Sequence, residues 1–442
     1  MAESRVTASG WRAAAAAALL ACAVTGCSGG DDPAEETLKS CPEPPVAGEI
    51  QHLIAYGQSL SVGAFAVPAI TTSSRHDSLK FSGGVRPGDG GSKAATIYGG
   101  LAPLTETTFG NYGETPVAGA LEQINDLIQT ENSVSPADTP QQYLGSSAGV
   151  GGLTLAQLSK GSAPYAGLLD HIYYGKLNAG CLRKNYSPRA VLWMQGESDY
   201  AAGTTQSDYA AQLQILQQDI EQDAARLAGT GPAPVPLISF QTSSHIANGS
   251  ATPAIALAQW QASQESGRVI LAAPGYQFDY AGRLHLTAAS SKWLGAYLGI
   301  AYKRIAIDGQ SWRPLEPVSV SLATPLQIRA RFHVPQPPLA LDTSAVSNPG
   351  NFGFSLVNSS GAAIAISGVS LSAADEVTIS TSLPVTGGAT LRYAFDGSDQ
   401  SGHDSGPRGN LRDSQGDALV FDPGGIAKPM HNWCVIFEMP VT

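Results

Sequence analysis

Residues 49–63 read EIQHLIAYGQSLSVG, an apolar run that stops at Gly57 and places Ser59 between two glycines. The run predicts a buried β-strand, because its centre, residues 53–56, is continuously apolar. Glycine and serine are common in turns, so an ordinary turn accounts for the end of the strand. A serine displayed at a strand end also suits a nucleophile. The stretch alone does not decide between the two interpretations.

The chain that follows alternates strand and helix patterns up to about residue 303. The predicted strands are apolar runs, and the predicted helices have apolar residues spaced by three or four positions. The strands cover residues 189–196, 235–244 and 268–275, and the helices cover 115–129, 207–228 and 287–304. This alternation predicts a mostly parallel, doubly wound sheet. In such a sheet, ligands bind beyond the carboxyl ends of the strands.

The pattern changes after about residue 305. The stretch VSVSLATPLQIRARFHV (318–334) alternates with a period of two, and turn residues separate several similar short runs. This pattern predicts an antiparallel β-sandwich over residues 306–442. Its last strand contains Trp433. One interpretation is that the sandwich binds carbohydrate, with Trp433 stacked on a sugar. The preferred interpretation is a structural sandwich that packs on the preceding domain.

The N-terminus has the features of an export signal. Two arginines precede an apolar run that is too short to span a bilayer. The run ends in VTGC (24–27), which resembles a bacterial lipobox. We therefore predict a signal peptide over residues 1–26, lipidation of Cys27, and a flexible tether over 27–48 that leads to a domain at 49–305. Plain secretion, with a free Cys27, is the alternative.

Composition narrows the function classes. The 442-residue chain has a formal net charge of −11 and no basic stripe, which argues against nucleic-acid binding. Cys41, Cys181 and Cys434 remain after the signal and lipidation cysteines are set aside. Export permits one disulfide among them, and the sequence leaves the pair open. Their spacing matches no zinc pattern, so no metal is expected.

Chemically capable residues lie at the ends of predicted strands or just before predicted helices. They are Ser59, the pair Gln195 and Glu197, the glycines 151–152, and His285 just before the last helix of the domain. A serine needs a base to take its proton, and histidine suits that role at neutral pH. Glycine N–H groups and an amide such as that of Gln195 are suitable donors to an oxyanion. Because strand ends of one parallel sheet share an edge, we expect these residues to converge.

These blocks carry a resemblance to a known family. GQSLSVG (57–63), GVGGLTLAQL (149–158), WMQGESD (193–199) and LHLTAASSKWLG (284–295) resemble, in order, the blocks of the SGNH/GDSL hydrolases. The variant is similar to the sialate O-acetylesterase-like carbohydrate esterases. The resemblance covers about residues 49–303 and implies a three-layer, flavodoxin-like α/β fold. It implies hydrolysis of acetyl esters on a carbohydrate, without a cofactor.

The resemblance also implies roles for individual residues. Ser59 is the expected nucleophile and His285 the expected general base. The oxyanion hole is expected to use the N–H of Ser59, the N–H of Gly152 (or Gly151) and the amide of Gln195. Glu197 is expected to support the loop that holds Gln195.

One departure concerns the acid that orients the base. The family places Asp three residues before the histidine, where this chain has Gly282. Asp279 lies six residues before His285 and is our candidate for the acid. Glu197 and a backbone carbonyl are the alternatives, and either would leave a Ser–His dyad. Because the acid orients the imidazole, we expect its loss to lower the rate without necessarily abolishing it.

Two other carboxylate and histidine patterns receive ordinary interpretations. Glu197 and Asp199 stand too close in sequence to flank a sugar as a glycosidase pair, so we expect Asp199 to cap the next segment. The dipeptides at 76–77 and 403–404 each join His to Asp, and we expect solvated loops there.

The prediction is therefore a membrane-anchored bacterial cell-envelope lipoprotein with esterase activity on acetylated carbohydrate. One alternative is a catalytically impaired esterase fold that binds glycan or a surface partner. The other is a lipase-like carboxylesterase.

Overall fold

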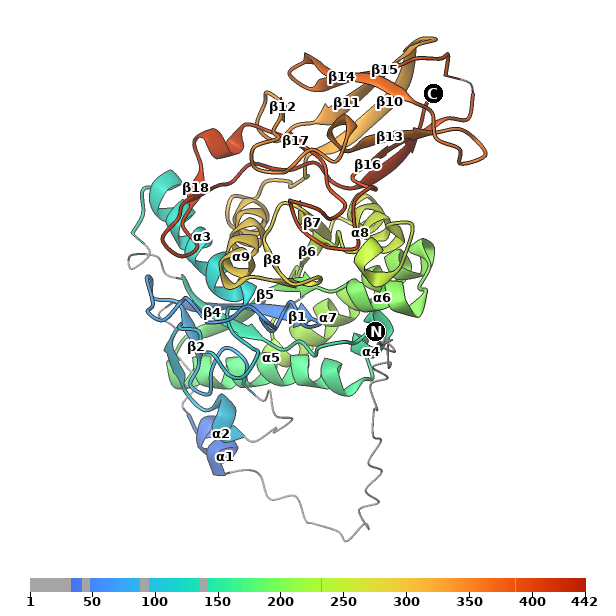
Figure 1. The fold of residues 1–442 in the computed structure, drawn as a ribbon. Helices are drawn as coiled ribbons and strands as arrows, with labels where there is room; N and C mark the ends of the chain where they lie inside the picture. Colours follow the sequence, from blue (N-terminus) through green and yellow to red (C-terminus); the bar gives the residue numbers. More distant parts are fainter. Residues whose placement is uncertain are drawn as a thin grey trace, which may run out of the picture.

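The structure is a computed structural model that describes residues 33–41, 48–87, 95–135, 138, 141–231, 233–385 and 387–442 (Figure 1). The predicted signal peptide 1–26 and Cys27 lie outside these residues. Among the described helices, none is both long and apolar enough to cross a membrane.

A seven-stranded sheet forms the centre of the first part of the chain. Its order is β3-β2-β4-β1-β5-β6-β7, and β4-β1-β5-β6-β7 are all parallel. The strands are β1 (Glu49–Gly57), β2 (Leu79–Phe81), β3 (Leu101–Pro103), β4 (Gln141–Ser147), β5 (Asn185–Met194), β6 (Leu237–Gln241) and β7 (Val269–Pro274). In chain order these five parallel strands read 2-1-3-4-5, the flavodoxin-like order. The predicted fold class is confirmed.

Helices cover both faces of this sheet. One face packs on α3 (Pro116–Glu131) and α9 (Ala288–Tyr302). The other face packs on α5 (Ala163–Cys181), α7 (Gln206–Ala228) and α8 (Ala254–Glu265). Strand β1 serves both layers because its side chains alternate, with Leu53 in the first core and Ile54 in the second. This part of the chain therefore has three layers, helices, sheet and helices, with one apolar core on each face of the sheet.

Local sequence explains where the long helices begin and how two of them meet. The hydroxyl of Thr115 caps α3 and that of Thr287 caps α9. Helices α3 and α9 approach closely at Gly295, which lacks a Cβ. A Cβ at this position would lie 2.0 Å from the carbonyl oxygen of Pro116. Short helices complete this part: α2 (Ala95–Tyr98), α4 (Leu155–Leu158), α6 (Glu197–Ala202), the 3₁₀ turn Ile246–Asn248 and the π turn Lys303–Ile307.

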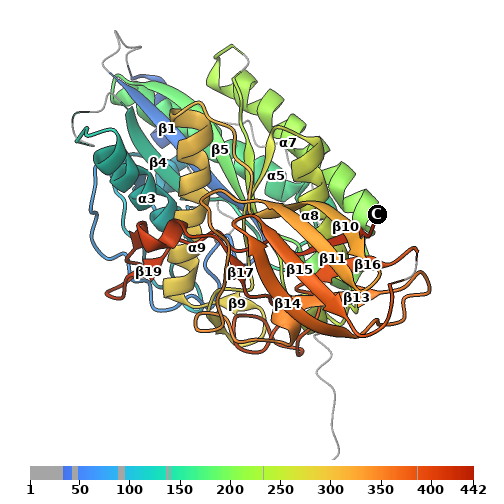
Figure 2. The ribbon, with the colours of Figure 1, turned by 90° about the horizontal axis from the view of Figure 1, so that it is seen from above.

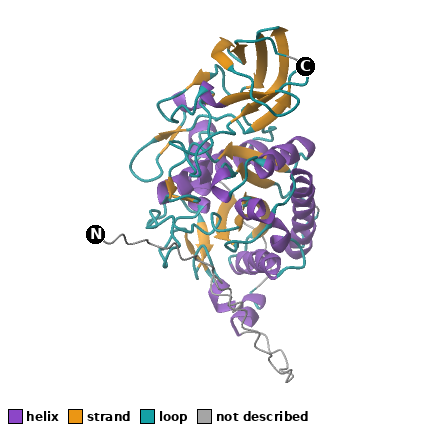
Figure 3. Ribbon diagram, turned by 45° about the vertical axis from the view of Figure 1, so that its right-hand side comes forward, coloured by secondary structure: helices purple, strands orange, loops and turns teal. Residues whose placement is uncertain are grey.

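The C-terminal part is an antiparallel β-sandwich, as predicted. Figure 3 shows its strands gathered at one end of the molecule. One sheet has the order β10-β11-β15-β14 and the other β13-β16-β20. The strands are β10 (Glu316–Thr324), β11 (Gln327–His333), β13 (Phe354–Val357), β14 (Ile366–Ala373), β15 (Glu376–Thr381), β16 (Thr390–Tyr393) and β20 (Phe437–Pro440). Trp433 is 3% exposed in the core between them, so its face is not available to stack on a sugar.

The sandwich packs directly on the α/β part. Leu257 of α8 belongs to the sandwich core. The side chain of Gln241, at the end of β6, donates to the carbonyl oxygen of Ile436 and accepts from its N–H, at 2.9 and 2.7 Å. The hydroxyl of Tyr276 donates to the carbonyl oxygen of Cys434 at 2.6 Å. The two parts therefore share buried apolar and polar contacts.

A second attachment runs along α9. Figures 1 and 2 show the segment with β18 (Val420–Phe421) and β19 (Lys428–Pro429) beside α9. Tyr297 of α9 donates its hydroxyl to the carbonyl oxygen of His431 at 2.8 Å.

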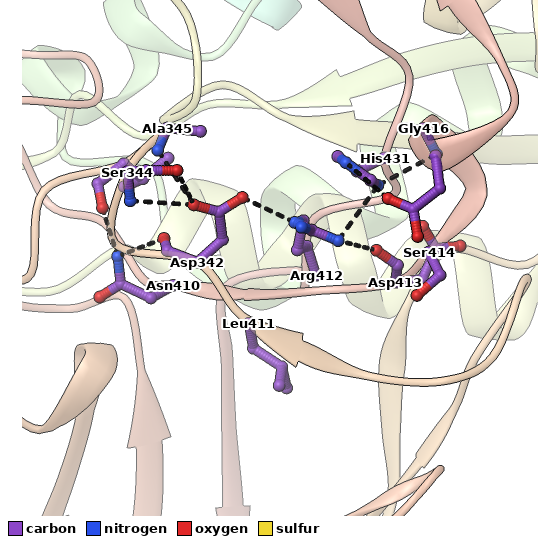
Figure 4. Close-up of polar contacts among 12 residues, drawn as sticks. Asp342, Ser344, Ala345, Asn410, Leu411, Arg412, Asp413, Ser414, Gly416 and His431 are labelled. Atoms are coloured by element: carbon purple, nitrogen blue, oxygen red, sulfur yellow. Dashed lines mark hydrogen bonds and ion pairs between the residues drawn. The ribbon is translucent and has the colours of Figure 1, made fainter.

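The base of that segment is a charged cluster around Arg412 (Figure 4). Arg412 lies on β17 (Leu411–Arg412), which pairs with β12 (Ala340–Leu341). Its guanidinium donates to Asp342 at 2.8 Å and to the carbonyl oxygen of Asp413 at 2.8 Å. The Asp413 carboxylate accepts the N–H of Asn432 at 2.8 Å. These bonds fix the segment that lies on α9.

The region predicted as a tether contains a helix in its described part. Helix α1 (Pro33–Lys39) packs on α5, where Tyr173 donates its hydroxyl to Glu35 at 2.9 Å. A disulfide joins Cys41 to Cys181 at the end of α5, which answers the pairing that the sequence left open. Residues 33–41 are thus held on the folded domain, because the disulfide and the buried Leu38 anchor them.

Candidate active site

The structure brings Ser59 and His285 together across 226 residues of sequence. Ser59 lies in the turn after β1, at the carboxyl edge of the parallel sheet. His285 lies on a small hairpin formed by β8 (Tyr280–Ala281) and β9 (His285–Leu286), just before α9. The Nε2 atom of His285 is 3.0 Å from the Oγ atom of Ser59. This is the geometry that a nucleophile and its general base require.

The electrostatic state of His285 suits a base. Burial lowers the pKa of its imidazole below the usual 6.5, because the charged form loses solvation. The ring is therefore neutral at pH 7 and able to accept a proton. Among the described residues, no Asp or Glu oxygen forms a hydrogen bond or ion pair with His285.

The candidate acid, Asp279, lies at the base of the same hairpin but contacts a different histidine. Its Oδ1 atom is 2.6 Å from Nε2 of His403, a residue of the C-terminal part. The other ring nitrogen of His403 is 3.0 Å from Asp404. The His–Asp dipeptide at 403–404, expected to be a solvated loop, thus contacts the hairpin of His285. Local sequence could not show this, because the partners are 124 residues apart.

The glycine loop, which is the candidate oxyanion-hole segment, lies beside Ser59. A Cβ on Gly151 would lie 3.7 Å from the Cβ of Ser59, and the N–H of Val150 donates to the carbonyl oxygen of Gly57 at 3.0 Å. Gly152 has φ +77°, the left-handed region that favours glycine. Within the described chain, the N–H groups of Ser59 and Gly152 donate to no other group. Both are therefore available to a ligand.

Gln195 lies beside this loop and is fully buried. Its Nε2 atom donates to the carbonyl oxygen of Leu153 at 3.2 Å and to Asp199 at 2.5 Å. Its Oε1 atom accepts the hydroxyl proton of Tyr209 at 2.7 Å. Because both amide protons have partners, Gln195 braces the glycine loop in this structure. A role as oxyanion donor requires that it release one of them.

Asp199 and Glu197 each contact a different loop near Gln195. The carboxylate of Asp199 accepts the N–H of Leu155 at 2.8 Å, so it holds the start of α4. Glu197, at the start of α6, accepts the hydroxyl of Thr242 at 2.8 Å. Burial raises the pKa of Glu197 to about 7, and its Oε2 atom is buried without a hydrogen-bond partner among the described residues.

Sequence reasoning missed Phe65, which borders the Ser–His pair. Its ring centroid is 4.7 Å from that of His285, and its side chain is 45% exposed. Its φ of +61° is unusual for a bulky residue. A local signal was absent, because Phe65 lies two positions after the serine block and resembles any exposed phenylalanine.

The described residues contain no group of three or more His, Cys, Asp or Glu side chains that could hold a metal ion. The arrangement of a serine, a neutral histidine and free N–H donors is suited to acyl transfer.

Comparison with known proteins identifies a similar family. Residues 146–304 match the family described as carbohydrate esterase, sialic acid-specific acetylesterase. The resemblance predicted from the sequence is confirmed. The matched segment contains the glycine loop, Gln195, Glu197 and His285.

Several solved structures resemble this chain, and the one with a TM-score above 0.5 supports the fold. A carbohydrate acetylesterase from Xanthomonas citri is 13% identical, with a TM-score of 0.52 over 88% of this chain and 81% of that chain. A protein from Arabidopsis thaliana is 18% identical, with a TM-score of 0.41 over 57% and 97%. An acetylxylan esterase from Geobacillus stearothermophilus is 13% identical, with a TM-score of 0.29 over 58% and 94%. No curated protein matches the sequence. The family match supports an esterase that acts on carbohydrate acetyl groups, and the Xanthomonas citri structure supports the fold alone.

Proposed function

We propose that this protein is a serine esterase that removes acetyl groups from carbohydrate hydroxyls, with Ser59 as nucleophile and His285 as general base. The observation that carries the proposal is the 3.0 Å approach of Nε2 of His285 to Oγ of Ser59, beneath a loop with free N–H groups. The family match supports acetylated carbohydrate as the substrate class.

The proposed reaction has two halves. Ser59 Oγ attacks the acetyl carbonyl carbon while Nε2 of His285 takes the hydroxyl proton. The N–H groups of Ser59 and Gly152 stabilise the oxyanion that forms. His285 then gives the proton to the departing sugar oxygen, which leaves an acetyl group on Ser59. Water attacks this ester, His285 takes a proton from the water and returns it to Ser59, and acetate departs.

The orientation of His285 in this scheme comes from its hairpin and its neighbours. Ala281 pairs with His285 across the hairpin, and Phe65 packs against the imidazole ring. The site therefore works as a dyad supported by backbone. A Ser–His dyad without a contacting acid is slower than a triad, because nothing stabilises the imidazolium directly.

The test is acetate release from acetylated mono- and oligosaccharides and from p-nitrophenyl acetate by purified protein. Wild type is expected to release acetate and Ser59→Ala to lose the activity. Longer nitrophenyl esters test the lipase-like alternative, which predicts a preference for long chains.

One observation favours a second candidate, a catalytically impaired protein that binds glycan. His285 has no carboxylate partner among the described residues. A fluorophosphonate probe separates the two candidates. Labelling at Ser59 supports the enzyme, and a failure to label folded protein supports the binder.

We further propose export and attachment to the cell envelope through a lipid on Cys27. The lipobox-like VTGC at 24–27 supports this, and so does the disulfide between Cys41 and Cys181, since disulfides persist in oxidising compartments. Labelling of cells with a fatty-acid analogue tests the proposal. Label is expected on wild type and not on Cys27→Ser, whereas unlabelled wild type would contradict it.

A further inference from the structure

A loop of the C-terminal sandwich holds the hairpin that carries His285. Three contacts join the loop, residues 396–408, to the hairpin and its approach. His403 binds Asp279 at 2.6 Å, and Arg283 donates to the carbonyl oxygen of Asp399 at 3.0 Å. A Cβ on Gly402 would lie 2.8 Å from the carbonyl oxygen of Phe278. The two chain segments therefore lie in direct backbone contact.

The loop is itself fixed to the sandwich. The N–H of Ser347 donates to the carbonyl oxygen of His403 at 3.0 Å, and its hydroxyl donates to the carbonyl oxygen of Asp404 at 2.7 Å. Arg408 donates to the carbonyl oxygen of Ser347 at 2.8 Å and to that of Gly406 at 2.7 Å. These hydrogen bonds hold the backbone around His403 to the rest of the sandwich.

Charge favours the bond between Asp279 and His403. The hydrogen bond that His403 donates to Asp279 raises the pKa of His403, and Asp404 adds to this, while burial and Lys428 oppose it. The hydrogen bond from His403 lowers the pKa of Asp279, with Lys428 in support and burial opposed. Arg283 and Asp399 are the other charged groups of this contact. At pH values above the pKa of Asp279 and below that of His403, the two side chains form an ion pair.

We infer that His403 is a positioning residue, which acts through Asp279 to hold His285 against Ser59. The inference rests on the proposed esterase function. Few contacts separate His403 from His285. The carbonyl oxygen of Asp279 accepts the N–H of Thr287 at 3.1 Å, and Thr287 lies two residues after His285. Small displacements of a catalytic group lower the rate strongly. On this account the accessory sandwich is a part of the catalytic site.

Kinetics of four variants test the inference: His403→Ala, Asp279→Asn, the double variant, and Asp375→Asn as control. Asp375 pairs with Arg331 at 3.0 Å in the same sandwich. His403→Ala and Asp279→Asn are each expected to lower kcat by about three- to tenfold, as suits a half-exposed pair, with KM unchanged. The double variant is expected to match the single variants, and the control to match wild type.

Two kinetic outcomes overturn the inference. One is a His403→Ala variant with the kcat of wild type. The other is a loss of about 10³-fold or more in Asp279→Asn alone, which would mark Asp279 as the acid that acts on His285 directly.

The pH profile gives a readout that a merely structural role would not move. The charge of His403 is present at low pH and is lost as pH rises through its raised pKa, above 6.5. Wild-type kcat is therefore expected to decline on the alkaline side. His403→Arg keeps the positive charge at high pH. We expect this variant to have a higher kcat than His403→Ala, equal to that of wild type, and to lack the alkaline decline. An alkaline decline that is identical in wild type, His403→Ala and His403→Arg contradicts the inference.

Hydrogen exchange tests the contact without any activity. Amides of residues 278–287 are expected to exchange faster in His403→Ala than in wild type or Asp375→Asn, at equal melting temperature. Unchanged exchange there contradicts the inference. If no variant hydrolyses any acetyl ester, the proposed function fails, and the exchange result still decides whether His403 holds the hairpin.

Discussion

The Oγ atom of Ser59 and the Nε2 atom of His285 lie 3.0 Å apart, although the residues come from the first strand and the last hairpin of the α/β part. The parallel sheet explains the meeting. Ser59 follows β1, and the segment after β7, which carries His285, leaves the sheet at the same carboxyl edge.

The pH dependence of the reaction follows from the environment of His285. Its pKa is lowered by burial, and the base must be neutral to accept a proton. On the acid side of the profile, we expect kcat/KM to rise with pH and to reach half its maximum below pH 6.5. A midpoint well above 6.5 in the kcat/KM profile contradicts this assignment.

Gly152→Ala is expected to lower kcat by about tenfold or more. At φ +77° an alanine costs about 1–2 kcal/mol, and relief of that strain turns the N–H away from the oxyanion. Gly161→Ala is a matched control, since Gly161 has φ +93° and, like Gly152, open space around a Cβ. Both variants are expected to lose similar stability in thermal melts, and only Gly152→Ala to lose activity. Equal activities in Gly152→Ala and Gly161→Ala would show that the N–H of Gly152 is not part of the oxyanion hole.

Glu197 makes stability depend on pH. Its folded pKa of about 7 is above the 4.5 of an exposed carboxyl, so the folded state binds the extra proton between these values. Its contribution is therefore lost as pH rises from about 4.5 past 7. Urea melts at pH 5 and pH 8 are expected to show a smaller loss in Glu197→Gln than in wild type, by on the order of 2 kcal/mol. An equal loss in both proteins would show that Glu197 is already ionised in the fold.

The disulfide is expected to stabilise the fold without affecting the site. It closes a separation of 140 residues at the end of α5, near the start of β5 and opposite the edge that carries Ser59. Cys41→Ser with Cys181→Ser is expected to lower the free energy of unfolding by roughly 2–5 kcal/mol. Acetate release at a temperature where both proteins are folded should be equal. A large loss of activity there would link α1 to the site.

The sequence predicted the features that local patterns and sheet topology determine. Ser59 follows a predicted strand, whereas the glycine loop and His285 each precede a predicted helix. Because the carboxyl ends of parallel strands share an edge, the convergence of Ser59 and His285 could be expected. The alternation with a period of two was enough to predict the sandwich.

The remaining features depend on contacts between distant segments. Asp279 binds His403 because the sandwich packs on the hairpin, and no local pattern encodes that packing. Trp433 is buried in the sandwich core, among residues that are distant in sequence. Both protons of Gln195 have partners because Leu153 and Asp199 come close only in the folded chain.

The most direct test of the account is acetate release by wild type and Ser59→Ala on the same acetylated carbohydrate. The account predicts release by wild type and a loss of about 10³-fold or more in folded Ser59→Ala, because the nucleophile is gone. Wild-type activity that persists in Ser59→Ala would contradict it.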